Sequence, residues 1–375
     1  MKIVLAPDSF KESLSSIQVC EAMERGVRNV SGEFKVIKLP LADGGEGTVH
    51  TLVAATGGQI IEKRVTGPDG KRVNAHFGLL GDRTTAVIEM AQASGLPLLP
   101  PEKRNPLHTT TFGTGELIKA ALDLDVENII IGIGGSATND CGTGMAQALG
   151  LSFYHQKSVI SNPMTGGLMG AVERIDTTQL DPRILRVKIT VACDVDNPLL
   201  GPRGASIVYA PQKGAGPDMV ALLEKNMQHI INLIEKKYRS VRDVPGAGAA
   251  GGLGAGLMAF LNAELKSGIN TVLDAVKFEN QIADADIIFT GEGKIDEQSA
   301  MGKTIHGIVS RASKYNVPVI AIGGSVSERA ETLFDKGLLS LFSICNEPMS
   351  LQNAISNASR LVEKTTERIL RVFVK

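Results

Sequence analysis

The stretch NIIIGIGGSATND, residues 128–140, joins a run of β-branched residues to glycines and short polar side chains. β-Branched residues favour strands, and a strand that ends directly in glycine or a carboxylate is typical of the parallel sheets of open α/β folds. Six further runs have this form. Together the predicted strands are Lys2–Pro7, Lys35–Pro40, Asn128–Ile133, Lys188–Ala192, Asp286–Phe289, Val317–Ile322 and Leu339–Ile344. The sequence therefore predicts an α/β fold.

Segments of helical period lie between these strands. Apolar residues recur three or four positions apart in 14–27, 220–234 and 351–372, which predicts helices that face the core. Ser15 and Gln18 have the spacing of a capping box, which marks the start of the first of these helices.

The segment from Gln59 to Ala91 has a different pattern. Its runs IIEKRVTG, KRVNAHFGLLG and TTAVIEMA are separated by the turn residues of 68–70 and 81–82. Short strands joined by such turns predict an antiparallel meander. We therefore predict two α/β lobes. Residues 1–56 plus 275–375 form a flavodoxin-like lobe with a parallel sheet, and residues 57–274 form an inserted α/β lobe that contains the meander.

Composition excludes several classes of function. The chain has 375 residues and a formal net charge of -1, whereas surfaces that bind nucleic acid or anionic membranes are usually basic. Its four cysteines form no C-x-x-C pair, so neither a structural zinc site nor a disulfide framework is expected. We predict no nucleic-acid partner, and the sequence leaves the oligomeric state open.

Two segments bear on location. The N-terminal run MKIVLAPDSF has too few apolar residues before Pro7 for the core of a signal peptide. The glycine-rich apolar stretch Gly246–Leu261 is shorter than the roughly 20 residues that a membrane span needs. We therefore expect a soluble, cytoplasmic protein with no membrane partner.

The segment GEGKIDEQSAMGKT, residues 291–304, ends like a phosphate-binding P-loop. The P-loop pattern G-x-x-x-x-G-K-[ST] would require glycine at position 297, which is Glu297. A carboxylate inside the loop would repel the phosphate that the backbone N–H groups must hold. A standard P-loop is therefore excluded.

Two other segments resemble dinucleotide-binding fingerprints. Gly132–Ala137 follows a strand but has no acidic residue about 20 positions further on, as a ribose-binding site requires. Gly246–Gly251 follows a charged segment with a proline, where a strand is needed. The sequence therefore gives little support to NAD binding.

Glycine next to a carboxylate recurs at the ends of predicted strands. The four cases are Asp43–Gly47, Gly134–Asp140, Asp194–Asn197 and Gly291–Asp296. Glycine lets backbone N–H groups approach an anion, and carboxylates can bind Mg²⁺ or accept a proton. With nearby lysines, these groups suit phosphoryl transfer from a Mg²⁺-nucleotide. The same pairs also cap helices and fill turns, so the residues alone indicate a small-molecule α/β enzyme, with a kinase as one option.

At these residues the sequence resembles a known family, the bacterial type-1 glycerate kinases (glycerate 2-kinases). The resemblance covers nearly the whole chain. The matching segments are APDSFKESLS (6–15), ADGGEGT (42–48), GTGELI (113–118), GIGGSATND (132–140), ACDVDNPLLG (192–201), PQKGA (211–215), GAGAAGGLGAGL (246–257), and GEGKID with GKT (291–304).

The resemblance implies an enzyme that uses ATP and Mg²⁺ to phosphorylate D-glycerate to 2-phosphoglycerate, in the breakdown of glyoxylate, glucarate or galactarate. Three alternatives stay open. They are a kinase of another small hydroxy acid, phosphorylation at the 3-hydroxyl, and a non-catalytic ligand-binding regulator on the same fold.

For a glycerate kinase we place the active site in the cleft between the lobes. Asp194 is the first candidate for accepting the hydroxyl proton of the substrate. Its rivals are Asp8, Asp43 and Glu46. Lys11 is expected to stabilise the transferring phosphoryl group or to pair with the substrate carboxylate. The residues expected to bind the nucleotide are Gly134, Gly135, Ser136, Thr138, Asp140, Lys294 and Lys303, and those expected to bind Mg²⁺ are Glu292 and Asp296.

One position departs from the family pattern. The family usually has two glycines after the Asn-Asp of its central motif; here these positions are Cys141 and Gly142, so the first glycine is a cysteine. If position 141 needs a positive φ angle, cysteine is costly there, and the loop that carries Asp140 changes shape.

Overall fold

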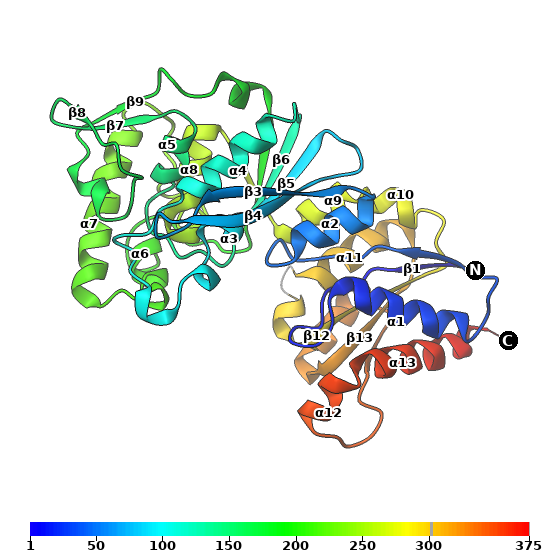
Figure 1. Ribbon diagram of the computed structural model, residues 1–375. Coiled ribbons are helices and arrows are strands. Elements are labelled where there is room, and N and C mark those ends of the chain that lie inside the picture. Colours follow the sequence, from blue (N-terminus) through cyan, green and yellow to red (C-terminus); the bar gives the residue numbers. More distant parts are fainter. Residues whose placement is uncertain (301–302, 375) are drawn as a thin grey trace. The chain divides into compact units, whose positions relative to one another are not determined.

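The chain folds into two compact units in a computed structural model that describes residues 1–300 and 303–374 (Figure 1). Unit 1 comprises Met1–Asp43, His50–Gly57 and Gly268–Lys375, and unit 2 comprises Gly44–Val49 and Gly58–Ser267. The predicted domain limits, 1–56 plus 275–375 and 57–274, stay a prediction that limited proteolysis can test.

Unit 1 is built on a five-stranded parallel sheet in the order β14-β13-β12-β1-β2. Renumbered within this unit, the order is that of flavodoxin, which confirms the flavodoxin-like lobe. Its strands are β1 (Lys2–Leu5), β2 (Lys35–Lys38), β12 (Ile287–Ile295), β13 (Val319–Val326) and β14 (Ser340–Ser343).

Helices complete unit 1. They are α1 (Ser16–Arg28), α9 (Gly268–Ala275), α10 (Phe278–Ile282), α11 (Thr304–Ala312), α12 (Leu351–Ser356) and α13 (Ala358–Phe373). Helix α2 (Thr48–Thr56) is shared, because the boundary between unit 2 and unit 1 falls within it, between Val49 and His50. The predicted capping box is confirmed, because Ser15 Oγ accepts from the Gln18 N–H and Gln18 Oε1 accepts from the Ser15 N–H. The helices α1 and α13 lie side by side (Figure 1), and a Cβ at Gly26 would meet the Glu363 carbonyl oxygen at 2.4 Å.

Unit 2 contains a six-stranded mixed sheet in the order β11-β10-β6-β5-β4-β3. Its strands are β3 (Gln59–Thr66), β4 (Arg72–Leu79), β5 (Thr85–Glu89), β6 (Asn128–Gly132), β10 (Lys188–Ala192) and β11 (Glu264–Lys266). β3, β4 and β5 pair antiparallel in succession, which confirms the meander, and β5 then pairs parallel with β6. A three-stranded sheet that the sequence did not predict comprises β7 (Ser152–His155), β8 (Ser158–Val159) and β9 (Arg174–Asp176).

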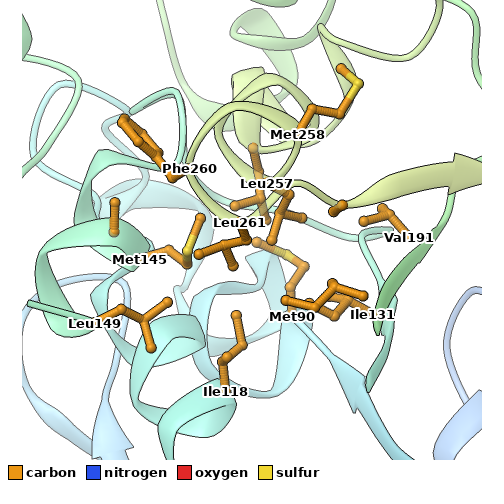
Figure 2. Close-up of a cluster of buried hydrophobic side chains, with 14 of the residues drawn as sticks. Met90, Ile118, Ile131, Met145, Leu149, Val191, Leu257, Met258, Phe260 and Leu261 are labelled. Atoms are coloured by element: carbon orange, nitrogen blue, oxygen red, sulfur yellow. The ribbon is translucent and has the colours of Figure 1, made fainter. Parts of the chain in front are cut away.

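The core of unit 2 packs between this sheet and its helices (Figure 2). The helices are α3 (Ala91–Ser94), α4 (Phe112–Leu122), α5 (Thr143–Ala148), α6 (Ala205–Tyr209), α7 (Pro217–Ile234) and α8 (Ala249–Leu261). Ile131 on β6 and Val191 on β10 are fully buried with Met145 on α5 and Leu257 on α8. Among the residues that the structure describes, none of the helices is both long and apolar enough to cross a membrane.

Candidate active site

A cavity of about 790 Å³ lies in unit 1 at the carboxyl edge of its sheet. Its lining residues follow or belong to all five strands, from Asp8 after β1 and Asp43 after β2 to Glu292 on β12, Gly324 on β13 and Cys345 after β14. The strand order reverses between β1 and β12, and ligands of open α/β sheets bind at such a switch point. The cavity gathers seven of the predicted site residues, namely Asp8, Lys11, Asp43, Glu292, Lys294, Asp296 and Lys303.

Asp8 is positioned by the start of helix α11 and by its own neighbour. Its Oδ2 accepts a hydrogen bond of 2.6 Å from the Thr304 hydroxyl, and its Oδ1 accepts one of 2.6 Å from the Ser9 N–H. Burial raises the pKa of Asp8 to about 6, and the charge of Asp43 adds to the rise, while both hydrogen bonds and Lys11 oppose it. A carboxylate with this pKa is ionised at neutral pH and can still accept a proton.

Glu292 lies within β12. The prediction that this strand ends at Phe289 is wrong, because pairing with β13 continues through Lys294 to Ile295. Burial raises the pKa of Glu292 to about 7, with the charges of Asp8 and Asp296 adding to the rise. Among the described residues, its buried Oε1 has no hydrogen-bond partner. This oxygen is therefore suited to a ligand that supplies positive charge.

Three lysines surround these carboxylates. Lys294 Nζ lies 3.0 Å from Asp296 Oδ2, and the Lys294 side chain is largely exposed. Lys11 is exposed, and Lys303 is the N-cap residue of α11, which begins at Thr304. Gly302, the first residue of the Gly-Lys-Thr sequence, lies outside the described residues. A helix N-terminus together with lysines favours an anion such as phosphate.

The carboxylates of the cavity are candidate ligands for a metal ion. Over residues 1–300 and 303–374, no group of three or more His, Cys, Asp or Glu side chains is arranged to hold a metal ion. Mg²⁺ is commonly bound by one or two carboxylates, with waters and substrate phosphates as its other ligands. The unpartnered Oε1 of Glu292 fits such a site, with Asp296 in the same cavity.

In unit 2, the predicted phosphate-binding residues follow β6. Gly134 and Gly135 are exposed, with Gly135 at φ 74, whereas Ser136 and Thr138 are buried. Lys213 donates hydrogen bonds of 2.7 Å to Ser136 Oγ and of 2.6 Å to the Thr138 carbonyl oxygen. Burial lowers the pKa of Lys213 to about 7, partly offset by the charge of Asp140. The sequence prediction missed this lysine, although its segment PQKGA was among the matching motifs.

Asp140 is fully buried and its carboxylate is occupied by the unit's own groups. It accepts hydrogen bonds from the N–H and hydroxyl of Thr111, at 2.8 Å each, and from the N–H groups of Gly142 and Gly144. Burial raises the pKa of Asp140, and these bonds offset part of the rise. This geometry favours a role in holding the loop over direct contact with a nucleotide.

The next residue, Cys141, has φ 55 and is fully buried, so the left-handed conformation considered from the sequence is present. The glycine-rich segment at the start of α8 packs directly against this loop. A Cβ on Gly251 would lie 2.0 Å from the Thr138 carbonyl oxygen, and a Cβ on Gly256 would lie 2.4 Å from the Cys141 carbonyl oxygen. The glycines of 246–257 therefore allow close backbone packing.

The last two predicted residues are also in unit 2. Glu46 is exposed on the segment Gly44–Val49, whose Gly44 carbonyl oxygen lies 2.6 Å from where a Cβ of Gly132 would be. This segment therefore lies beside the end of β6. Asp194 is exposed and lies just after β10, which ends at Ala192 as predicted.

A parallel α/β sheet that carries lysines and carboxylates together at its carboxyl edge is suited to binding phosphorylated small molecules. A family model described as the glycerate kinase family matches residues 3–374. The chain belongs to the glycerate kinase family, whose members are kinases.

Similar proteins agree over nearly the whole chain. A glycerate kinase from Bacillus subtilis (strain 168) is 53% identical over 370 residues, covering 98% of this chain and 97% of that protein. A glycerate 2-kinase from Escherichia coli (strain K12) is 49% identical, covering 96% of this chain and 94% of its own. The crystal structure of a candidate glycerate kinase 2 from Salmonella typhimurium LT2 has a TM-score of 0.91 and 48% identity, covering 100% of this chain and 98% of that one.

Proposed function

We propose that this protein phosphorylates D-glycerate with ATP at the 2-hydroxyl, giving 2-phosphoglycerate and ADP. The observation that carries the proposal is the unit 1 cavity, in which Asp8 and Glu292 lie with Lys11, Lys294 and Lys303 at a switch point of a parallel sheet. The choice of the 2-hydroxyl is supported by the relative from Escherichia coli that is named glycerate 2-kinase. The proposed setting is organic acid catabolism in the cytoplasm.

In the reaction, the hydroxyl oxygen of glycerate attacks the γ-phosphorus of ATP, and the bond to the β–γ bridging oxygen breaks. The hydroxyl proton passes to a carboxylate. Asp8 is the favoured acceptor, because it is partly buried, has a pKa of about 6 and is oriented by Thr304 and Ser9. Asp194, the first candidate from the sequence, and its rivals Asp43 and Glu46 stay predictions.

Glu292 and Asp296 would hold Mg²⁺, which would supply positive charge to the nucleotide phosphates. The lysines of the cavity stabilise the negative charge that spreads over the transferring phosphoryl group. Lys11 lines the same cavity as Asp8 and can bind the phosphoryl group or the glycerate carboxylate. In unit 2, phosphate binding by Gly134, Gly135, Ser136 and Thr138 stays a prediction, and Asp140 is proposed to position their loop.

The test is an ATP-dependent assay with a panel of small hydroxy acids, with the phosphate position of the product assigned by NMR. We expect ADP formation with D-glycerate and a phosphate on carbon 2. Phosphate on carbon 3 would establish the other regiochemistry, and a clear preference for another acid would change the substrate. Absence of ADP formation with every acid, despite ATP binding, would favour a non-catalytic regulator.

A further inference from the structure

The unit 1 cavity has a second end that the phosphoryl-transfer chemistry does not use. It is apolar, and we name it the apolar arm. Its residues are Phe10, Ile344, Met349, Ala354, Ile355 and Ala358. Phe10, Ile344 and Ala358 are buried in one hydrophobic cluster, whereas Met349 and Ile355 are partly exposed. The cavity therefore runs from a charged end to an apolar one.

The walls of the apolar arm are fixed by hydrogen bonds and strand pairing. Ser13 Oγ donates a hydrogen bond of 3.1 Å to the Ile355 carbonyl oxygen, which ties α12 to the loop that carries Phe10. β13 continues to Val326, beyond its last pair with β14 at Gly323. Gly324 and Ser325 of this extension line the cavity, and because glycine has no side chain, the polar groups of Gly324 there are those of its backbone.

The size and polarity of the cavity limit what can fill it. Small-molecule sites usually have volumes of about 300–1,000 Å³, with mostly apolar walls and a few polar groups. The volume here, about 790 Å³, is in that range. Glycerate is small and polar throughout, so contact with six apolar side chains would not strengthen its binding. A nucleoside triphosphate has both an anionic end and a flat apolar ring with a polar edge.

We propose that the apolar arm binds the adenine ring of ATP, with the triphosphate extending toward Lys11, Lys294 and Lys303. Apolar burial then supplies much of the affinity for the base, and the backbone of the β13 extension bonds its polar edge. This inference rests on the proposed function only for the identity of the nucleotide.

Cys345 provides a direct test, because it lies in the cavity and is exposed. The chain is treated with iodoacetamide, and the alkylation rate of each cysteine is followed by peptide mass spectrometry. The reaction is run alone and with adenosine, ADP, pyrophosphate or D-glycerate. The partly buried Cys193 in unit 2 is the internal reference.

We expect adenosine and ADP to slow alkylation of Cys345. At about ten times the Kd the slowing should be roughly tenfold, because the site is then about 90% occupied. Pyrophosphate and D-glycerate should leave the rate within about twofold. Equal protection by pyrophosphate and ADP, or no protection by ADP under conditions where calorimetry detects its binding, would overturn the assignment.

A pair of variants tests the same point without relying on the thiol. Ala354→Phe fills the apolar arm, while Val372→Phe makes the same kind of enlargement at an exposed position on α13 outside the cavity. We expect Ala354→Phe to raise the Kd for ADP about tenfold or more and to leave the KM for D-glycerate within about twofold. Val372→Phe should change neither the Kd for ADP nor the KM for D-glycerate. Circular dichroism verifies that both variants are folded.

An unchanged Kd for ADP in folded Ala354→Phe would contradict the inference. The two proposals fail in different ways. If the protein phosphorylates glycerate but adenosine does not protect Cys345, the adenine site is wrong and the activity stands. If adenosine protects Cys345 but no hydroxy acid is phosphorylated, the nucleotide site stands and the proposed reaction is wrong.

Discussion

Lys213 donates a hydrogen bond of 2.7 Å to Ser136 Oγ at a position where only 1% of the lysine is exposed. A buried lysine is rare unless its ammonium is paired, and here it also bonds the Thr138 carbonyl oxygen. It therefore ties the turn Pro211–Lys213 to the loop after β6.

The stability of unit 2 should depend on pH through Lys213. Its pKa falls from 10.5 to about 7 on folding, so between these values the unfolded chain binds more protons than the folded chain. The free energy of unfolding therefore rises with pH across this interval, by roughly 1 kcal/mol per pH unit. Lys213→Met should lack this rise in urea denaturation at pH 7–9.

The matched control for this prediction is Lys225→Met, since Lys225 is an exposed lysine on α7. Its unfolding free energy should follow that of the unmodified chain at every pH. If the free energy of unfolding varies with pH in the same way for Lys213→Met and the unmodified chain, Lys213 does not change its protonation on folding.

Cys141 should tolerate only small replacements without a branch at Cβ. Its φ of 55 lies in the left-handed region, where a β-branched residue is strained by roughly 1–3 kcal/mol. Cys141→Val should therefore lower the free energy of unfolding by about 2 kcal/mol more than Cys20→Val does. Cys20 is equally buried but lies on helix α1, and denaturant titration of both variants makes the comparison. Equal losses would mean that the φ angle carries no cost.

The proton acceptor can be identified from two variants. Asp8→Asn should lower kcat by about 10²–10⁴-fold with little change in either KM, which is the range for loss of a general base. In the unmodified enzyme kcat/KM should rise with pH through about 6, because Asp8 must be ionised. Asp194→Asn is made in parallel. A large loss in Asp194→Asn with near-normal turnover in Asp8→Asn would restore the choice made from the sequence.

Glu292 should control the requirement for Mg²⁺. Glu292→Gln removes the charge of the unpartnered oxygen, so the Mg²⁺ concentration for half-maximal activity should rise about tenfold or more. Glu297→Gln is the control, since Glu297 is exposed, lies outside the cavity and pairs with Arg329. If the two variants have the same Mg²⁺ dependence, Glu292 does not bind the metal.

Gly251 should be irreplaceable. At φ 69, with a Cβ contact of 2.0 Å to the Thr138 carbonyl oxygen, Gly251→Ala combines backbone strain with a clash against main chain. We expect a loss of more than about 4 kcal/mol, or a failure of unit 2 to fold. Gly216→Ala is the control, because nothing lies within 4 Å of its Cβ position, and it should lose at most about 1 kcal/mol. Thermal unfolding of Gly251→Ala near that of the control would contradict this account.

Much of the fold was predictable because its signals are local. β-Branched runs ending in glycine or a carboxylate located seven strands, and turn residues located the meander. The end of β12 was predicted wrongly because Gly291 and Gly293 resemble a strand terminus. In the structure these glycines instead allow close approach, since a Cβ on Gly291 would meet the Ile322 carbonyl oxygen at 2.2 Å.

The site was predictable in part. Residue types and the family motifs indicated the carboxylates and lysines that line the unit 1 cavity. Burial is a tertiary property, so the sequence could not separate the half-buried Asp8 from the exposed Asp194. Lys213 was missed for the same reason, since a lysine in a turn is normally solvated.

The pairing of β1 with β12, and of α1 with α13, has a consequence for biosynthesis. A nascent chain that has reached Ser267 contains every residue of unit 2 but lacks β12, β13, β14 and α13. Until they are translated, Val19 and Met23 of α1 lack the β12 and α13 members of their hydrophobic cluster, although both are fully buried in the finished protein. Unit 1 therefore completes its folding after unit 2, and ribosome-associated chaperones have a defined apolar helix to protect in the interval.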